Sequence, residues 1–365
     1  MLKAAGATGI AALTMSAAGC ATPLGRGSAD ERTIEDMAGR RVALPAAVSS
    51  VVGLGGGTLR YLSYMGLTDR LAGVEEIATD ASMVRPYTIA HGTTFASLPS
   101  VGPSWGGDPE LIAQADPDVI FFAGDPSQAA TIQQKTATPT VVIAYGDMYT
   151  NRQQTYTAWQ IIGTVTGRTD RATTLVDAHR SYIDDLEERT ADVSSDVPTV
   201  YYGGKSYHGA RGITGTKYPF PPFRFVNAAN AARLDYETVT NLTVSREDLL
   251  RWDPEMLFVD RANLPLVRED VATHPEYRHL SAIQSGAVFG LHPMSAYQRN
   301  DATMLGAAYY IGTKVSPERF ADVSFREKID EIYEVFLGES VHQSMVEAYG
   351  PFGPVEVIPD DGDRQ

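Results

Sequence analysis

Side chains that could hold an anionic ligand gather in this sequence just after short apolar segments. Tyrosine, tryptophan and arginine recur there with glycine beside them. Aromatic rings offer contact area, and a guanidinium offers paired donors to carboxylate or catecholate oxygens. The residues with this chemistry are Gly56, Arg60, Arg85, Tyr87, Trp105, Tyr145, Lys205, Tyr207, His208, Arg211, Tyr297 and Arg299. Together they favour a binding site for a flat, anionic metal chelate.

Two parts of the chain alternate short apolar runs with amphipathic segments, a pattern typical of parallel sheets covered by helices on both faces. In residues 31–150 the sequence predicts strands at Val51–Leu54, Leu71–Val74, Val119–Phe122 and Thr140–Ala144, and helices at Thr58–Met65 and Asp108–Ala115. In residues 195–350 it predicts strands at Thr199–Tyr202, Met256–Val259 and Ala287–Gly290, and helices at Arg246–Arg251, Ala302–Tyr310, Phe325–Leu337 and Glu339–Tyr349. We therefore expect two doubly wound α/β lobes.

These lobes explain why the candidate residues could act together. Ligands of doubly wound sheets sit beyond the carboxyl ends of the strands, which is where the candidates fall. A hairpin at Thr33–Pro45, turning at Ala38-Gly39, is expected before the first lobe, and an acidic tail over residues 351–365 after the second.

The segment Asn151–Val193, within a connecting region of residues 151–194, is expected to join the lobes. It predicts a short helix, a break at Gly167, and a long helix from about Asp170 to Val193 with Thr169 as its N-cap. Apolar residues recur along the long helix with the period of a one-sided helix. At 1.5 Å per residue it would span roughly 35 Å, which is enough to cross from one lobe to the other.

A local repeat on either side of this segment indicates related lobes. Glu110 stands six positions before Asp116-Pro117, and Glu247 stands six positions before Asp253-Pro254. Each Asp-Pro pair is expected to end a helix and begin a buried strand, because proline cannot continue the helix and biases the residue before it to extended geometry.

The composition excludes some classes of function. Acidic residues outnumber basic ones, 45 to 30, and the formal net charge of the 365-residue chain is −15. Without a clustered basic stripe, nucleic-acid binding is not expected. After the first twenty residues no apolar run is long enough to span a bilayer. Cys20 is the only cysteine, so no disulfide forms within the chain.

The N-terminus has the layout of an export signal. Residues 1–19 combine Lys3, a short apolar core and small residues directly before Cys20. This arrangement resembles the lipobox of bacterial lipoproteins, although Ala17 stands where leucine is usual. The resemblance implies cleavage before Cys20 and lipid on its sulfur, with residues 20–30 forming the lipidated cysteine and a flexible tether.

Beyond residue 31 the chain resembles the substrate-binding proteins of bacterial ABC importers for iron–siderophore, haem and cobalamin compounds. The resemblance spans most of residues 31–340. It is carried by Asp36-Met37-Ala38-Gly39-Arg40, Val51–Leu59, Gly66–Glu76, Leu98-Pro99-Ser100-Val101-Gly102, both Asp-Pro joints, Tyr202-Gly203-Gly204 and the connecting helix.

The resemblance implies two α/β lobes joined by one rigid helix, with the ligand held in a cleft between them and bound without a cofactor or any chemistry. It implies a monomer that is lipid-anchored at the outer face of the membrane and that delivers its ligand to a permease dimer with its ATPase. An acidic residue on each lobe would pair with permease arginines: Glu75 or Glu76 in the first lobe, and Asp235 or Glu237 in the second.

Several alternatives stay open at this point. Haem, a corrinoid, an oxyanion such as molybdate, or a metal–amino acid complex could replace the siderophore. A nucleotide-dependent oxidoreductase is favoured only by Gly53–Gly57 with Glu75 about twenty residues on, and Thr58 stands where the third glycine belongs. A metal site built directly from His91, His208 or His292 is a further alternative. A surface adhesion protein does not match the α/β pattern.

Overall fold

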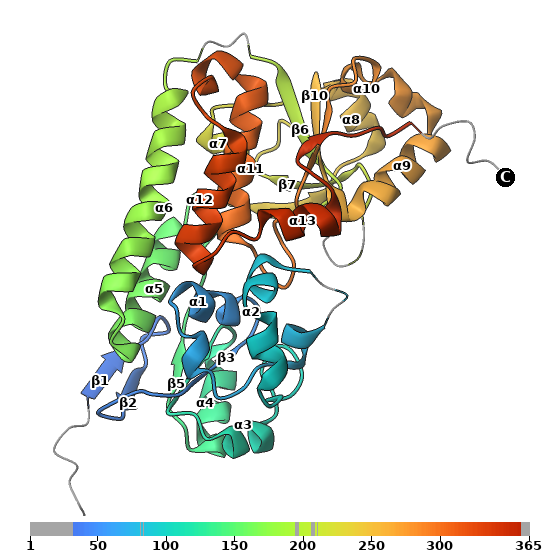
Figure 1. Ribbon diagram of the computed structural model, residues 1–365. Coiled ribbons are helices and arrows are strands. Elements are labelled where there is room, and N and C mark those ends of the chain that lie inside the picture. Colours follow the sequence, from blue (N-terminus) through green and yellow to red (C-terminus); the bar gives the residue numbers. More distant parts are fainter. Residues whose placement is uncertain are drawn as a thin grey trace, which may run out of the picture.

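The structure is a computed structural model that describes residues 32–80, 82, 84–193, 197–205, 209 and 211–358. It has two α/β lobes stacked end to end, with a long helix running beside both (Figure 1). The expected two-lobe α/β fold is confirmed.

The first lobe is built on a parallel sheet in the order β3-β4-β5, preceded by the antiparallel hairpin β1-β2. Its strands are β1 Arg32–Glu35, β2 Arg41–Leu44, β3 Val51–Leu54, β4 Val119–Phe122 and β5 Thr140–Val142. Every residue of the three parallel strands is buried, as expected for a sheet covered on both faces.

Helices cover this sheet on both sides. They are α1 Thr58–Tyr64, α2 Pro86–Ser97, α3 Pro109–Ala115 and α4 Pro126–Thr136, with 3₁₀ turns at Thr68–Arg70 and Glu76–Thr79. The strand expected at Leu71–Val74 forms only single bridges, from Leu71 to Val51 and from Val74 to Ser100. It falls short of a strand because its two ends pair with two different segments, rather than with one strand along its whole length.

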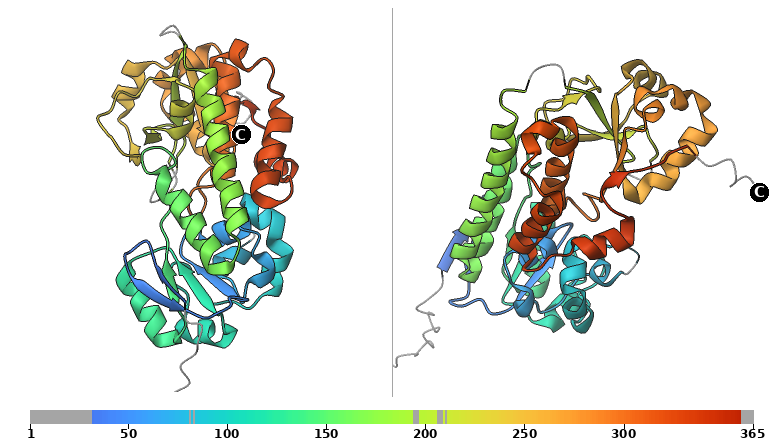
Figure 2. Two further views of the ribbon diagram at one scale, coloured as in Figure 1. Left: turned by 90° about the vertical axis from the view of Figure 1, so that its left-hand side faces the viewer. Right: turned by 45° about the horizontal axis from the view of Figure 1, so that its top comes forward.

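Helices α5 (Arg152–Thr166) and α6 (Thr169–Arg189) connect the lobes. Gly167 ends α5 with a φ of 72°, as the expected break requires. Arg168, rather than Thr169, holds the N-cap position of α6 and makes no side-chain cap. The two helices pack against each other, and Figure 2 shows α6 running along the second lobe down to the first.

The second lobe has a five-stranded sheet in the order β12-β11-β10-β6-β8 and a separate hairpin β7-β9. Its strands are β6 Thr199–Gly203, β7 Gly215–Tyr218, β8 Ala229–Asn230, β9 Thr240–Thr243, β10 Met256–Asp260, β11 Val288–Leu291 and β12 Gly353–Pro354. All pairs in the large sheet are parallel except β11 with β12.

Its helices are α7 Pro221–Phe225, α8 Arg246–Trp252, α9 Leu264–Thr273, α10 Ser281–Gln284, α11 Asp301–Val315, α12 Phe325–Leu337 and α13 His342–Tyr349, with 3₁₀ turns at Arg261–Asn263, Pro275–His279 and Pro317–Phe320. The last helices also reach the first lobe. Phe336 of α12 packs edge-on against Tyr64 of α1, and the hydroxyl of Tyr349 in α13 donates to the carbonyl of Val84 at 2.8 Å.

One expectation about the joints between helices and strands was wrong. Residues 351–358 pack on the second lobe, where β12 joins the sheet and Val357 is 3% exposed; residues 359–365 of the acidic tail lie outside the described residues. Asp116 and Asp253 do end helices before a strand, but both are left-handed, with φ of 50° and 40°, rather than extended. Aspartate tolerates this geometry better than most residues.

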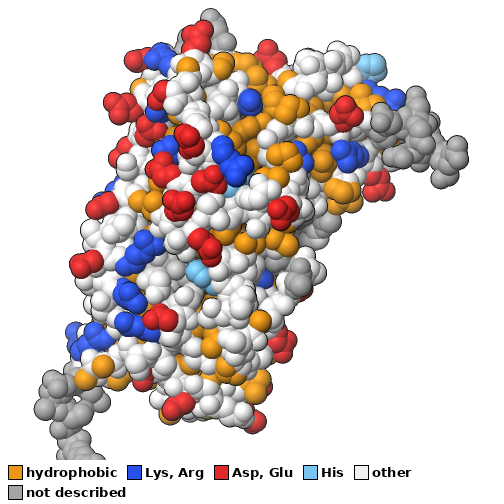
Figure 3. All heavy atoms as spheres, in the orientation of Figure 1, with side chains coloured by type: hydrophobic (Ala, Val, Ile, Leu, Met, Phe, Trp, Pro, Cys, Tyr) orange, Lys and Arg blue, Asp and Glu red, His pale blue; other side chains and the backbone are white. Residues whose placement is uncertain are grey.

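Within the described residues, no helix combines the length and apolar character needed to cross a membrane. On the face shown in Figure 3, acidic side chains are scattered over the second lobe, and basic ones gather at the lower left, where β1, α5 and α6 lie.

Candidate functional site

A turn from the second lobe reaches into the first lobe. The bridge between Ser295 and Arg299 closes it after β11, and its tip residues Tyr297 and Gln298 have φ of 47° and 85°. The hydroxyl of Tyr297 donates to Oε2 of Glu75 at 2.9 Å and accepts from the Trp105 amide at 3.0 Å. Two consecutive left-handed residues without a glycine each cost about 1 kcal/mol or more, so contacts across the lobes hold the tip in place.

Trp105 is the exposed ring of this region. Its side chain is 56% exposed and stands edge-on to Tyr297, with ring centroids 5.0 Å apart. Its indole also lies so close to Gly56 that a Cβ added there would come within 2.7 Å of the ring. The predicted residues Gly56, Trp105 and Tyr297 therefore meet at one place, and a side chain at position 56 would displace the indole from its present position.

Glu75 lies inside this region, so its prediction as a permease-docking residue was wrong. It is 3% exposed, and its Oε1 accepts from the amides of Gly55 and Gly106, both at 3.1 Å. Burial raises the pKa of Glu75, while the hydrogen bonds from Gly55, Tyr297 and Gly106 oppose that rise. The same contacts weigh against the dinucleotide site, because the Gly55 amide is turned to Glu75 and not to a phosphate.

Arg299 bonds to both lobes, and its role as a ligand contact stays a prediction. Its Nε donates to Oδ1 of Asp301 at 2.7 Å. Its two terminal nitrogens donate to the carbonyls of Gly146 at 2.8 Å and Tyr145 at 3.1 Å, and to the Thr155 hydroxyl at 3.1 Å. The residue is 5% exposed, so its donors are all directed to the protein.

Arg60 approaches the same carboxylate from the first lobe. Its Nε lies 3.6 Å from Oδ2 of Asp301, and both side chains are fully buried. Within the part of the chain that the structure describes, none of its three nitrogens has a hydrogen-bond partner, and its guanidinium lies 5.0 Å from the ring centre of Tyr61. Asp301 thus faces two guanidinium groups, one from each lobe. We call Gly56, Arg60, Glu75, Trp105, Tyr145, Tyr297, Arg299 and Asp301 the interlobe site.

Tyr145 belongs to this site, whereas two other candidates lie in the interior of the first lobe. The Tyr145 hydroxyl is 3.1 Å from that of Thr58, and its ring stands edge-on to Tyr61 at 5.3 Å. Arg85 is 0% exposed, bonds the carbonyl of Ile77 and lies over the ring of Tyr87, which is 1% exposed. Arg85 and Tyr87 therefore pack the lobe instead of presenting polar groups to a ligand, which corrects their prediction as binding residues.

Charged residues at the strand ends of the second lobe complete the region. Lys205 follows β6, and Asp260 ends β10 with its Oδ2 accepting from the Tyr202 hydroxyl at 3.2 Å. Lys217 in β7 was not predicted as a site residue. Its charge interacts with those of Lys205, Arg299, Asp147 and Asp260. Nothing in the short, mixed-polarity sequence of β7 marks it as a strand that would bury a lysine.

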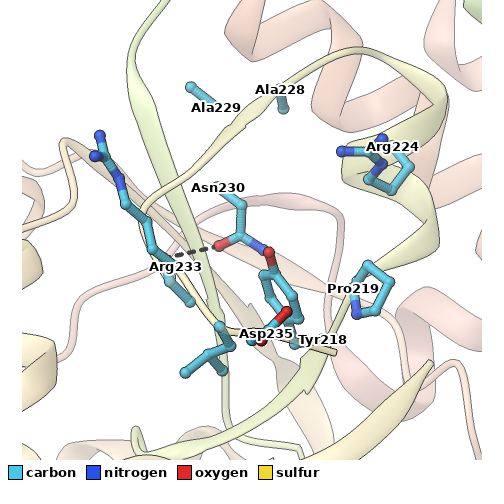
Figure 4. A pocket seen from close by; sticks show the side chains of 10 residues that line it. Tyr218, Pro219, Arg224, Ala228, Ala229, Asn230, Arg233 and Asp235 are labelled. Carbon is cyan, nitrogen blue, oxygen red and sulfur yellow. Dashed lines mark hydrogen bonds between the residues drawn. The ribbon is translucent and has the colours of Figure 1, made fainter. Parts of the chain in front are cut away.

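The remaining second-lobe candidates are at the surface or outside the described residues. Arg211 is exposed, and so are Asp235 and Glu237; Tyr207 and His208 lie outside the described residues. Asp235 lines a surface pocket of about 530 Å³ at the edge strand β8, together with Tyr218, Pro219, Arg224, Asn230 and Arg233 (Figure 4). This pocket offers both an acid and two guanidinium groups.

The described histidines do not form a metal centre. His91 stands edge-on to Phe95, and Nε2 of His292 donates to the Gly350 carbonyl at 2.9 Å. Among the described residues no three His, Cys, Asp or Glu side chains gather closely enough to hold an ion.

Comparisons with known proteins agree with this architecture. A family model described as periplasmic binding protein matches residues 51–294. The molybdate-bound protein MolA of Haemophilus influenzae has a TM-score of 0.68 at 19% identity, covering 85% of this chain and 99% of its own. The TroA-like periplasmic binding protein FepB of Veillonella parvula has a TM-score of 0.62 at 19% identity, covering 84% and 97%. CeuE of Helicobacter pylori with Ni(II) bound has a TM-score of 0.60 at 18% identity, covering 87% and 99%. No curated protein sequence matches this chain.

The chain belongs to the periplasmic binding protein family. Its members are extracytoplasmic substrate-binding components of ABC importers that deliver small ligands to a permease and its ATPase, and they are not enzymes. The expectation of a binding protein rather than an enzyme is therefore confirmed.

Proposed function

We propose that this protein captures an anionic metal chelate of the ferric-siderophore class in the interlobe site and hands it unchanged to its permease. The observation that carries the proposal is the 56% exposed indole of Trp105 between the lobes, beside Tyr297. A large exposed ring beside a second aromatic ring suits a flat ligand.

The solved structures that share this fold support more than one ligand chemistry. MolA was solved with molybdate and CeuE with Ni(II). A haem, a corrinoid, a metal–amino acid complex and an oxyanion such as molybdate therefore remain alternatives to the siderophore. They differ in colour, size and charge, so a single titration series separates them.

Addition of the correct ferric siderophore should quench tryptophan fluorescence saturably, because a coloured iron complex seated in the interlobe site would lie against Trp105. Ferric enterobactin, ferrichrome, haem, cobalamin and molybdate are titrated in turn. Trp159 is 0% exposed and Trp252 is only partly exposed, so Trp105→Phe should remove most of the quenching. Arg211→Ala tests the exposed arginine as a ligand contact, and a loss of affinity of about 2 kcal/mol or more would support it.

No saturable quenching by any chelate would overturn the proposed ligand class. Binding of molybdate alone, measured by calorimetry, would indicate that the ligand is an oxyanion. Equal quenching in wild type and Trp105→Phe would place the ligand away from the interlobe site.

We further propose that exposed acids dock the permease. Glu76 is exposed on the first lobe, and Asp235 and Glu237 are exposed on the second. With one such patch on each lobe, a monomer could engage both subunits of a permease dimer.

We also propose that the protein is exported and anchored by lipid on Cys20, which lies outside the described residues. Cys20→Ser should leave export intact but release the protein into the soluble fraction, because one thiol carries the attachment. Fractionation with metabolic labelling by a palmitate analogue measures both effects. Label and membrane retention equal to wild type in the variant would contradict the anchor.

A further inference from the structure

The pocket at β8 lies at an open edge of the second-lobe sheet. β8 is the last strand in the order of this sheet, so no further strand of the described chain pairs with its outer side. The Ala231 amide donates to the Val200 carbonyl of β6 at 2.8 Å. Because backbone groups point alternately to either side of a strand, the amide and carbonyl of Asn230 are directed away from β6. Asn230 lines the pocket of about 530 Å³, so the wall of the pocket includes an open strand edge.

Two guanidinium groups flank this edge. Arg224 and Arg233 are exposed and line the pocket, and Figure 4 shows them on either side of Asn230. The side-chain oxygen of Asn230 accepts from the Ala232 amide at 3.0 Å, so the protein already uses it. An extended segment of another chain can add to such an edge through main-chain hydrogen bonds. An acidic side chain on that segment would be bound by the arginines through charge-assisted hydrogen bonds.

Arg224 also contacts the first lobe. Its Nε and one terminal nitrogen donate to the hydroxyl of Tyr149 at 3.1 and 2.9 Å, and its guanidinium lies 5.2 Å from the centre of the Tyr149 ring. Tyr149 follows β5, so this contact joins the two lobes. The two donating nitrogens form the edge of the guanidinium that can bind both oxygens of a carboxylate. Since a carboxylate is a stronger acceptor than a neutral hydroxyl, it would compete with Tyr149 for Arg224.

We propose that the β8 pocket docks an extended segment of the permease that carries an acidic side chain, and that the carboxylate of this segment takes Arg224 from Tyr149. The inference rests on the proposed function, because the partner is the permease that receives the ligand. Asp235 lines the same pocket, so an arginine near the acid of the segment would complete the match of charges. Docking removes one contact between the lobes, which links arrival at the permease to release of the ligand.

The test uses two peptides blocked at both ends, Thr-Val-Glu-Val-Thr and the same sequence with glutamine in place of glutamate. Binding is followed by the NMR shifts of the Asn230 and Tyr149 amides at peptide concentrations up to about 10 mM, which detects a dissociation constant of about 1 mM. The glutamate peptide should shift both amides of wild type saturably, since Asn230 reports on the strand edge and Tyr149 on the broken contact. The glutamine peptide should bind at least about fivefold more weakly.

Four variants locate the site. Arg224→Ala and Arg233→Ala should each weaken binding of the glutamate peptide about fivefold, because each removes one guanidinium. Tyr149→Phe should strengthen it about threefold, because it removes the hydroxyl that competes for Arg224 and keeps the ring. Arg251→Ala is the matched control and should keep the wild-type affinity, because Arg251 is an exposed arginine of the same lobe that lies on α8 and pairs with Asp248. A thermal melt checks that each variant is folded.

Three results would overturn the docking site: equal binding of the two peptides, saturable shifts that spare Asn230, or no saturable shift up to about 10 mM. Unchanged or weaker binding in Tyr149→Phe would overturn the exchange of Arg224 between Tyr149 and the partner.

The peptide test needs no ligand, so it is independent of the titration that tests the ligand class. A ferric siderophore that binds while neither peptide does would keep the proposed function and overturn the docking site. Glutamate-dependent peptide binding to a protein that binds no chelate would keep the docking site and overturn the proposed ligand class.

Discussion

Asp301→Asn should lower the free energy of unfolding by about 3–5 kcal/mol, the range for removing one partner of a buried ion pair. Asp301 is 0% exposed and is the carboxylate between Arg60 and Arg299. Asparagine keeps the size of the side chain and removes its charge. Both guanidinium groups would then be buried without a counter-charge, one in each lobe, so the variant should also weaken the contact between the lobes.

Urea denaturation measures this loss, and Asp322→Asn is its control. Asp322 pairs with Arg189 at 2.6 Å, but its side chain is 67% exposed, so its removal should cost at most about 1 kcal/mol. Equal losses in the two variants would show that the charge of Asp301 does not hold the lobes.

The pH dependence of stability gives a second check on Asp301. Burial favours its neutral form, but the charges of Arg299 and Arg60 outweigh burial and hold the pKa of Asp301 below its usual 3.8. The ionised Asp301 should therefore stabilise the fold fully above about pH 4–5. This stabilisation should be lost as the pH falls below the pKa of the free side chain and through the lower pKa of the folded protein. Asp301→Asn should lack this acid-dependent part of the stability curve.

Local patterns identified the three strands of the first-lobe sheet and the central strands of the second, but not β7, β8, β9 or β12. The runs at Val51–Leu54 and Val119–Phe122 are β3 and β4 with the expected bounds, because four consecutive apolar residues between turn signals are the mark of a strand buried on both faces. Helix α4 was missed although Asp125-Pro126 caps it, with Asp125 accepting from the Ser127 amide. Its polar composition hid a helix that the cap alone would have indicated.

Sequence spacing also located the parts of the interlobe site, but not the pairings among them. Trp105 lies in the loop between α2 and α3 and Tyr297 in the turn after β11, and their rings meet. The contact that decides the role of Glu75 joins it to Tyr297, which is 222 residues away in the sequence. No local pattern distinguishes Glu75, which points inward, from Glu76, which points outward. The carbonyl acceptors of Arg299 were likewise not predicted, because they come from a different lobe.

Lys217 shows the opposite limit of sequence reasoning. The sequence pattern favoured arginine and aromatic residues in loops, whereas this lysine lies within a strand of a two-stranded hairpin. Its burial results from the packing of the hairpin against β6, which includes a hydrogen bond from the Lys205 amide to the Gly215 carbonyl at 2.9 Å. Such a long-range fit leaves no periodic signature in the sequence.

Glu75→Lys and Glu76→Lys form a matched pair that should separate stability from docking. Glu75→Lys should destabilise the protein by about 3–5 kcal/mol, because it removes the acceptor of Gly55, Gly106 and Tyr297 and buries a cation against amide donors. Glu76 is exposed, so Glu76→Lys should change the stability by no more than about 0.5 kcal/mol.

The two variants should differ equally clearly in transport. Glu76→Lys should bind ligand with wild-type affinity yet fail to support uptake, because a lysine would repel the permease arginine that an acid attracts. Glu75→Lys should lose ligand binding together with its fold, since Glu75 positions both Trp105, through the adjacent Gly106 amide, and Tyr297. Uptake at the wild-type rate by Glu76→Lys would remove this acid from the docking surface. A Glu75→Lys variant with wild-type stability would contradict this prediction. It would show that the buried hydrogen bonds of Glu75 do not organise the first lobe, and that other contacts hold Trp105 against Tyr297.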